Sequence, residues 1–94
     1  MLTLTLAVTG QFRRDYKRMK KQGRDMSLLE TVIDTLLAER PLPPRCRDHG
    51  LSGNYAGFRE CHVLPDWLLI YAVDRGRLVL TASRTGTHAE LLDR

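Results

Sequence analysis

The sequence predicts an α+β fold in which two helices cover one face of a four-stranded, mostly antiparallel sheet. In the first half of the chain, apolar residues recur at the spacing of two amphipathic helices. In the second half, three apolar runs are joined by short turns, which only antiparallel neighbours permit. The expected order is β-α-α-β-β-β with a short C-terminal helix, and the 94 residues are expected to form one domain over positions 1–94.

The first strand and first helix are predicted within residues 1–23. Leucines alternate with threonines at the start of the chain, a period of two that is typical of a strand. Thr9 is expected to cap the helix that follows, and Gly23 to end it. The buried face of this helix is expected to carry Phe12, Tyr16 and Met19.

A second helix is predicted to open with Ser27 and Glu30, which are spaced as a capping box. The prolines of the RPLPP sequence end this helix. Residues 45–57 hold three glycines without periodicity and are predicted to form a loop. The buried stripe of the second helix is expected to be Leu29, Val32, Ile33, Leu36 and Leu37.

Three strands are expected over residues 58–63, 67–73 and 78–84, with turns at Pro65-Asp66 and over residues 74–77. The second of these strands is apolar on both faces, which predicts a central position in the sheet. Thr87 and Glu90 form a second possible capping box, at the start of the last helix.

Positive charge is concentrated in the first helix. The net charge is +4, and seven of the 15 basic residues lie between positions 13 and 24. A solvated helix face is one explanation, and binding of a polyanion or an acidic partner is the other. The residues that would bind such a partner are Arg13, Arg14, Lys17, Arg18, Lys20, Lys21 and Arg24.

The sequence shows no run of about 18 apolar residues that would span a membrane, and its start lacks the basic segment of a secretory signal. A cytoplasmic location is therefore expected, with Cys46 and Cys61 as reduced thiols. Zinc is disfavoured, because the ligands that would join Cys46 and His49 are Cys61 and His62, whose adjacent side chains point to opposite faces of a strand. No metal or cofactor is expected.

Polar side chains that could perform chemistry gather in the second half of the chain. His49, His62 and His88 come from three segments that this topology can bring to one side of the sheet. His62 faces the side without helices if its neighbours in the strand face the helices. Each histidine alone has a structural explanation. Likewise, Asp66 is explained as a turn residue, Trp67 as core packing, and Arg59 and Arg84 as solvated strand ends.

Together, these side chains suit the cleavage of an RNA phosphodiester. That reaction needs a base for the 2′-hydroxyl, an acid for the departing 5′-oxygen and a fixed positive charge. Histidine can fill either proton role near neutral pH, and Arg84 offers a planar cation to phosphate oxygens. The indole of Trp67 could serve as a stacking platform for an unpaired base.

The stretches DHGLSGNYAGFRECHVLPDWLLIY and RTGTHAELL resemble the YafQ branch of the RelE/ParE superfamily of bacterial toxins. The likeness is strongest over residues 48–92 and looser in the helical half. It implies a RelE-like fold and a metal-independent, ribosome-dependent mRNA endonuclease that stops translation. It further implies attack by the 2′-hydroxyl, products with a 2′,3′-cyclic phosphate and a 5′-hydroxyl, and silencing by a cognate antitoxin.

The resemblance also assigns site residues. His88 is expected to be the general acid, while the general base is Asp66 or His49 and His62 orients substrate or shares the base role. Related toxins often carry an aromatic residue in place of Leu92, and a proline in place of Gly50. The implied catalytic set is His49, His62, Asp66, Arg84 and His88, and the implied substrate-binding set is Trp67, Arg59 and Leu92.

Two alternatives stay open at this point. ParE-type relatives share the fold but bind DNA gyrase without catalytic histidines, which would leave the histidines and Arg84 unexplained. A degenerate toxin that only binds its antitoxin is the second alternative. An intact set of proton-transfer groups argues against it.

Overall fold

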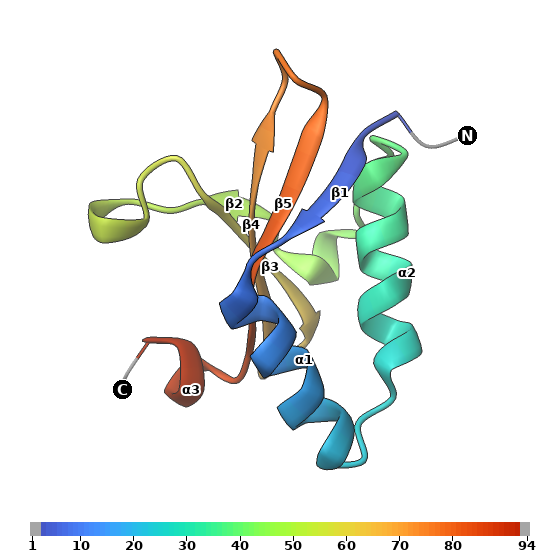
Figure 1. Ribbon diagram of the computed structural model, residues 1–94, viewed down its shortest axis with the longest axis vertical. Helices are drawn as coiled ribbons and strands as arrows, with labels where there is room; N and C mark the ends of the chain where they lie inside the picture. The colour runs from blue at the N-terminus through green and yellow to red at the C-terminus, as the bar shows by residue number, and fades with distance from the viewer. Residues whose placement is uncertain (1–2, 93–94) are drawn as a thin grey trace.

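The computed structural model describes residues 3–92, which form one mixed sheet flanked by helices (Figure 1). In chain order the elements are β1 (Thr5–Val8), α1 (Gly10–Lys21), α2 (Met26–Leu37), β2 (His49–Gly50), β3 (Arg59–Leu64), β4 (Trp67–Asp74), β5 (Val79–Gly86) and α3 (His88–Leu92). Among these described residues, no helix has the length and apolar character needed to cross a bilayer. Leu2, expected in the first strand, lies outside the described residues.

The sheet has the strand order β1-β5-β4-β3-β2. β1 runs parallel to β5, from which it is separated in the chain by α1, α2 and the strands β2 to β4. All other neighbours are antiparallel, and the β3–β4 and β4–β5 pairs are joined by the short turns that the sequence predicted. The central position predicted for β4 is confirmed, and its first five residues, Trp67 to Tyr71, are all buried.

The prediction of four strands was wrong by one, because His49–Gly50 pairs with β3 as the edge strand β2. Asp48, the residue before it, is held on the helix side of the sheet. Its carboxylate accepts hydrogen bonds from Tyr71 Oη at 2.6 Å and from Arg59 Nε at 3.2 Å. Because successive side chains of a strand alternate, anchoring Asp48 on one face sends His49 to the other.

The caps agree with the sequence at two helices and differ at the third. Thr9 Oγ1 accepts from the Phe12 N–H at the start of α1, and Thr87 and Glu90 form the reciprocal box at the start of α3. At α2 the cap is Asp25, which accepts from the Ser27 N–H. The expected Ser27–Glu30 box is absent, because the Glu30 carboxylate accepts from Tyr16 Oη at 2.7 Å.

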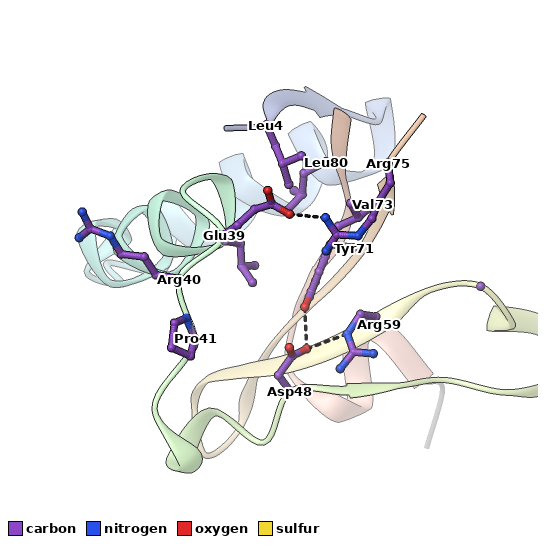
Figure 2. A pocket seen from close by; sticks show the side chains of 12 residues that line it. Leu4, Glu39, Arg40, Pro41, Asp48, Arg59, Tyr71, Val73, Arg75 and Leu80 are labelled. Atoms are coloured by element: carbon purple, nitrogen blue, oxygen red, sulfur yellow. Dashed lines mark hydrogen bonds and ion pairs between the residues drawn. The ribbon is translucent and has the colours of Figure 1, made fainter. Parts of the chain in front are cut away.

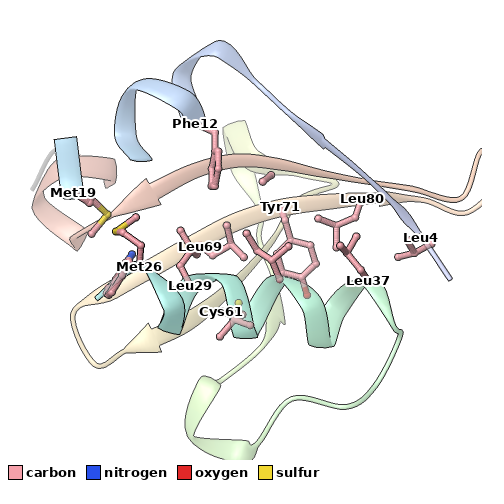
Figure 3. Close-up of a cluster of buried hydrophobic side chains, with 14 residues drawn as sticks. Leu4, Phe12, Met19, Met26, Leu29, Leu37, Cys61, Leu69, Tyr71 and Leu80 are labelled. Carbon is pink, nitrogen blue, oxygen red and sulfur yellow. The ribbon is translucent and has the colours of Figure 1, made fainter. Parts of the chain in front are cut away.

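The main core lies between the sheet and the helices α1 and α2 (Figure 3). Both helices present the predicted apolar stripes to it. Cys61, on β3, is fully buried in this core, so its neighbour His62 faces the opposite side of the sheet. The fully buried members of the core, each under 2% exposed, include Met19, Leu29, Cys61, Trp67, Leu69 and Leu80.

The second face of the sheet is partly covered, although the sequence predicted an open surface. Leu68 and Ile70 on β4 pack there against Leu91 of α3, with support from the segment over residues 51–58. This small cluster fixes the position of α3, and therefore of His88 at its start.

Candidate active site

Strand register places three of the predicted site residues, His49, His62 and Arg84, on the second face. One row across the sheet is His49, Glu60, Ile70 and Arg84, which are consecutive Cα partners on β2, β3, β4 and β5. The adjacent row is His62, Leu68 and Gly86. Since neighbouring strands are about 4.8 Å apart, the Cα atoms of Glu60 and Arg84 are roughly 10 Å apart across this face.

All three histidines have their Nδ1 atoms held by an oxygen that can only accept a hydrogen bond. Each Nδ1 therefore carries a proton, and the Nε2 atom of each ring is the nitrogen left to exchange protons. The donor–acceptor pairs are His49 Nδ1 to Arg47 O at 2.6 Å, His62 Nδ1 to Pro65 O at 3.1 Å and His88 Nδ1 to Asp66 Oδ1 at 3.0 Å.

Two of the histidines converge on a carboxylate that the sequence did not predict as a site residue. The rings of His62 and His88 are 5.7 Å apart between centroids. One oxygen of Glu60 and one ring nitrogen from each of these histidines lie within 4.8 Å of one another. Glu60 Oε1 also lies 3.6 Å from His49 Nε2, and the Glu60 side chain is only 8% exposed. An acidic residue inside a strand next to buried Cys61 was the available signal.

Asp66, in the turn between β3 and β4, holds His88 twice. Its Oδ1 accepts from the His88 ring at 3.0 Å and from the His88 backbone N–H at 3.3 Å. These hydrogen bonds from His88 lower the pKa of the Asp66 carboxyl below its ordinary value. Asp66 is therefore ionised at neutral pH, and its geometry is that of a residue that orients His88.

Arg84 is fixed by a buried carboxylate from α1. Its Nε and Nη2 donate to the two oxygens of Asp15 at 2.8 and 3.2 Å. Burial raises the pKa of Asp15, but hydrogen bonds from Arg84, Arg18 and the Thr85 N–H outweigh burial and leave the pKa lowered. Asp15 was not predicted as a site residue; its signal in the sequence was a charged residue between Phe12 and Met19 on the apolar stripe.

Two expected substrate contacts do not fit the structure, and Arg59 is the first. Its partner in the sheet, Tyr71, faces the helices, so Arg59 lies on the face opposite His62 and His88. There it lines a pocket of about 650 Å³, in which its Nε donates to Asp48 (Figure 2). Arg59 was expected at the catalytic rim because sequence proximity to His62 ignores the alternation of strand faces.

Trp67 is the second expected substrate contact that does not fit the structure. Its ring is 1% exposed, and its Nε1 donates to Thr85 Oγ1 at 2.8 Å. The guanidinium of Arg24 lies 5.6 Å from the ring centroid, so a cation covers one face of the indole. A base cannot stack on a buried ring, and core packing is the role that the structure supports. Leu92 ends α3, but its side chain lies outside the described residues.

The basic residues of the first helix fall into two groups. Arg18 donates from Nη1 to Asp15 at 2.9 Å and pairs through Nε with Glu90 at 3.1 Å, and its side chain is 35% exposed. Arg18 therefore links α1 to α3. Arg24 also has a partner within the protein, because it lies over the ring of Trp67. The exposed members are Arg13, Arg14, Lys17, Lys20 and Lys21.

The only metal-ligand group found among the described residues is Glu60, His62 and His88. Carboxylate oxygen and imidazole nitrogen are ligands that suit a first-row transition metal. The zinc ligands considered from sequence, which included Cys61 and His62, do not lie together. Cys61 is buried on the helix side of the sheet, and His62 faces the other side.

Comparisons with known proteins agree with this fold. Residues 4–93 match the model of a family described as "Bacterial toxin of type II toxin-antitoxin system, YafQ". The mRNA interferase toxin YafQ of Escherichia coli (strain K12) is 38% identical over 92 residues, which cover 97% of this chain and 98% of that protein.

Solved structures extend the likeness. YafQ in the E. coli DinJ-YafQ toxin-antitoxin complex has a TM-score of 0.86 at 37% identity, over 96% of this chain and 98% of that chain. A metal-bound toxin from Helicobacter pylori has a TM-score of 0.88 at 41% identity, over 97% and 99% of the two chains. The chain described here therefore belongs to the YafQ family of bacterial toxins of type II toxin-antitoxin systems.

Proposed function

We propose that this protein is an mRNA interferase, which cleaves mRNA during translation and is neutralised by a cognate antitoxin. Its relative in E. coli is named an mRNA interferase toxin, and a solved relative is bound to an antitoxin. The observation that carries the proposal is the convergence of His62 and His88 on Glu60, with the Nδ1 atom of each ring already occupied.

His88 is the general acid in this proposal. The Asp66 carboxylate holds its Nδ1, so the proton that leaves comes from Nε2 and goes to the departing 5′-oxygen. Asp66 is the positioning partner, because a carboxyl with a lowered pKa is a weak base at neutral pH.

The general base is the pair of His49 and Glu60, whose Nε2 and Oε1 atoms are 3.6 Å apart. Either atom can accept a proton at this place in the site, so the base role is assigned to the pair. It accepts the proton of the 2′-hydroxyl as the bond from that oxygen to phosphorus forms. The bond from phosphorus to the 5′-oxygen then breaks, leaving a 2′,3′-cyclic phosphate and a 5′-hydroxyl.

Arg84 stabilises the negative charge that builds on the non-bridging oxygens of this phosphate. Its hydrogen bond to Asp15 raises its pKa further, so it stays a permanent cation. His62 lies on the same face between these groups and contacts the substrate backbone.

The chemistry is proposed to need no metal, because these side chains supply each proton transfer and the fixed charge. A transition metal at Glu60, His62 and His88 would take the ring nitrogens that exchange protons. Added Zn²⁺ should therefore inhibit cleavage. A chelator that binds transition metals but leaves Mg²⁺ to the ribosome should not inhibit it. Loss of activity with this chelator, restored by Zn²⁺, would contradict metal independence.

The substrate is proposed to be mRNA held by the ribosome, which places the activity in the cytoplasm where translation occurs. The exposed basic residues of α1 provide the positive charge for contact with ribosomal RNA. The test is primer extension on a defined mRNA with purified ribosomes and antitoxin-free protein. Cleavage is expected only when ribosomes translate the mRNA.

Two other results would redirect the assignment. If the protein leaves mRNA intact but inhibits DNA supercoiling by gyrase, the ParE-like alternative holds. If it binds antitoxin and does neither, it is a degenerate toxin. Near-wild-type cleavage by both His88→Ala and Arg84→Ala proteins would remove the assigned mechanism while leaving the activity in place.

A further inference from the structure

We propose that Asp15, on α1, is a positioning residue that orients the guanidinium of Arg84 toward the scissile phosphate. This inference rests on the role proposed above for Arg84. Asp15 lies in the first half of the chain, far from the histidine-bearing segments, and reaches the site because α1 packs beside β5.

The contact between the two residues is side-on. Arg84 donates from Nε to Asp15 Oδ2 at 2.8 Å and from Nη2 to Asp15 Oδ1 at 3.2 Å. Two parallel hydrogen bonds fix both the position and the plane of a guanidinium. The N–H groups on Nη1 and the second N–H on Nη2 take no part in this contact. Tyr55 also lies near the guanidinium, and the N–H groups that it leaves can donate to phosphate oxygens.

Burial shows on which side of the guanidinium the carboxylate lies. The Asp15 side chain has no exposed surface, whereas the Arg84 side chain is 21% exposed. The carboxylate therefore backs the guanidinium from the protein interior, and the accessible part of Arg84 faces away from it. An anion that approaches from solvent meets Arg84 first.

Asp15 is itself held by the sheet. β1 ends at Val8, so the edge of β5 beyond Ala82 has no neighbouring strand, and Asp15 Oδ2 accepts the Thr85 backbone N–H there at 3.2 Å. Arg18 Nη1 and Gln11 Nε2 donate to Oδ1 at 2.9 and 3.3 Å. The Asp15 carboxylate thus has little freedom to move, and it fixes the guanidinium of Arg84 relative to the backbone of β5.

This arrangement has two opposing effects on an RNA substrate. The negative charge of Asp15 weakens the attraction of the site for phosphate in the ground state. The fixed orientation removes the need to order a flexible arginine when charge builds in the transition state. If orientation dominates, replacing Asp15 by asparagine lowers kcat, because Arg84 is no longer held in place. KM should not rise, because the variant has lost a negative charge near the RNA.

The experiment is a double-mutant cycle with ribosome-bound mRNA, in which kcat and KM are measured for four full-length, antitoxin-free proteins. These are the wild type, Asp15→Asn, Arg84→Gln and the double variant. We expect a loss of about 10²- to 10³-fold in kcat for Arg84→Gln. For Asp15→Asn we expect roughly 10- to 100-fold, with KM unchanged or lower. The double variant should match Arg84→Gln alone, because a positioning residue has nothing left to position.

Thr85→Val is the control for a purely structural effect. It removes the hydrogen bonds of Thr85 Oγ1 with Trp67 and Leu68 in the same buried region, yet leaves the Asp15–Arg84 contact in place. Circular dichroism would establish a temperature at which every variant is folded. Equal losses of kcat for Thr85→Val and Asp15→Asn there, or losses that multiply in the double variant, would overturn the inference.

Failure of this inference is distinguishable from failure of the proposed function. An inactive Arg84→Gln protein with an Asp15→Asn protein like wild type would reject only the positioning role. An active Arg84→Gln protein would reject the role of Arg84 itself, on which the positioning role depends.

Discussion

His88 and Asp66 are joined by two hydrogen bonds, one from the ring and one from the backbone of the histidine to the same carboxylate oxygen. The ring contact fixes which nitrogen carries the exchangeable proton, and the backbone contact fixes the start of α3. His88 therefore reaches the site already oriented, although both side chains are partly open to solvent at 44% and 72%.

This relationship predicts a graded series of activities. His88→Ala should lower cleavage by at least roughly 10²-fold, the usual effect of removing a proton-transfer group. Asp66→Ala should lower it by less. Asp66→Asn should be milder still, because the amide oxygen can still accept from Nδ1. Single-turnover cleavage measures the series, and antitoxin binding by each variant checks its fold. An Asp66→Asn protein as inactive as His88→Ala would indicate that the negative charge of Asp66 is needed, and not only its acceptor.

The buried position of Trp67 predicts an effect on stability and not on RNA binding. Trp67→Phe removes the hydrogen bond to Thr85 and should lower the free energy of unfolding by about 1 to 2 kcal/mol. Urea denaturation measures this change. KM for ribosome-bound mRNA should stay within about threefold of wild type, since a lost base stack would instead cost roughly 1–3 kcal/mol. A large rise in KM at unchanged stability would restore the stacking role.

Asp15 predicts a particular dependence of stability on pH. Its pKa is lowered in the folded protein from an ordinary value of 3.8, so its contribution to stability is complete above that value. The contribution is lost as pH falls through the folded-state pKa. The difference in unfolding free energy between wild type and Asp15→Asn should therefore shrink between about pH 5 and pH 2.

Urea denaturation at several pH values in this range tests the effect. Asp34→Asn is a suitable control, because Asp34 is exposed on α2. If the difference in unfolding free energy between wild type and Asp15→Asn stays constant as the solution is acidified, the contacts described do not lower the pKa of Asp15.

Charge reversal at Lys20 and Lys21 tests the basic surface of α1. Both are exposed at the end of the helix, and changing them to glutamate should weaken ribosome binding and flatten its dependence on salt. Arg45→Glu with Arg77→Glu makes the same change of charge on exposed residues outside α1. If both pairs of substitutions have equal effects, α1 is a solvated face and the attraction is due to net charge alone.

Much of the fold could be predicted because local signals and tertiary packing agree. The helix stripes, the cap at Thr9, the central position of β4 and the box at Thr87 and Glu90 are all found in the structure. The strand β2 could not be predicted from local pattern, because two residues carry no periodicity. Its pairing depends on Asp48 meeting Tyr71 and Arg59 from distant parts of the chain.

The sequence indicated the histidines of the candidate site, but it did not indicate most of the groups that contact them. The alternation of side chains along β3 predicted that His62 lies on the face opposite the helices, where the structure has it. Arg59 and Trp67 were expected at the site because they are its neighbours in sequence, but strand geometry and burial separate them from it. Asp15 and Glu60 were missed because a single acidic residue in an apolar stripe or strand has no motif, and its meaning depends on the partner opposite.

The central claim is that the 2′-hydroxyl of the substrate is the nucleophile and that these side chains move its proton. The most direct measurement is cleavage of a translated mRNA that carries a single 2′-deoxynucleotide on the 5′ side of the cleaved bond, with analysis of the product ends. We expect no cleavage at the modified position, and a 2′,3′-cyclic phosphate with a 5′-hydroxyl from unmodified mRNA. Cleavage of the modified mRNA at that bond, or products with a 5′-phosphate, would contradict it.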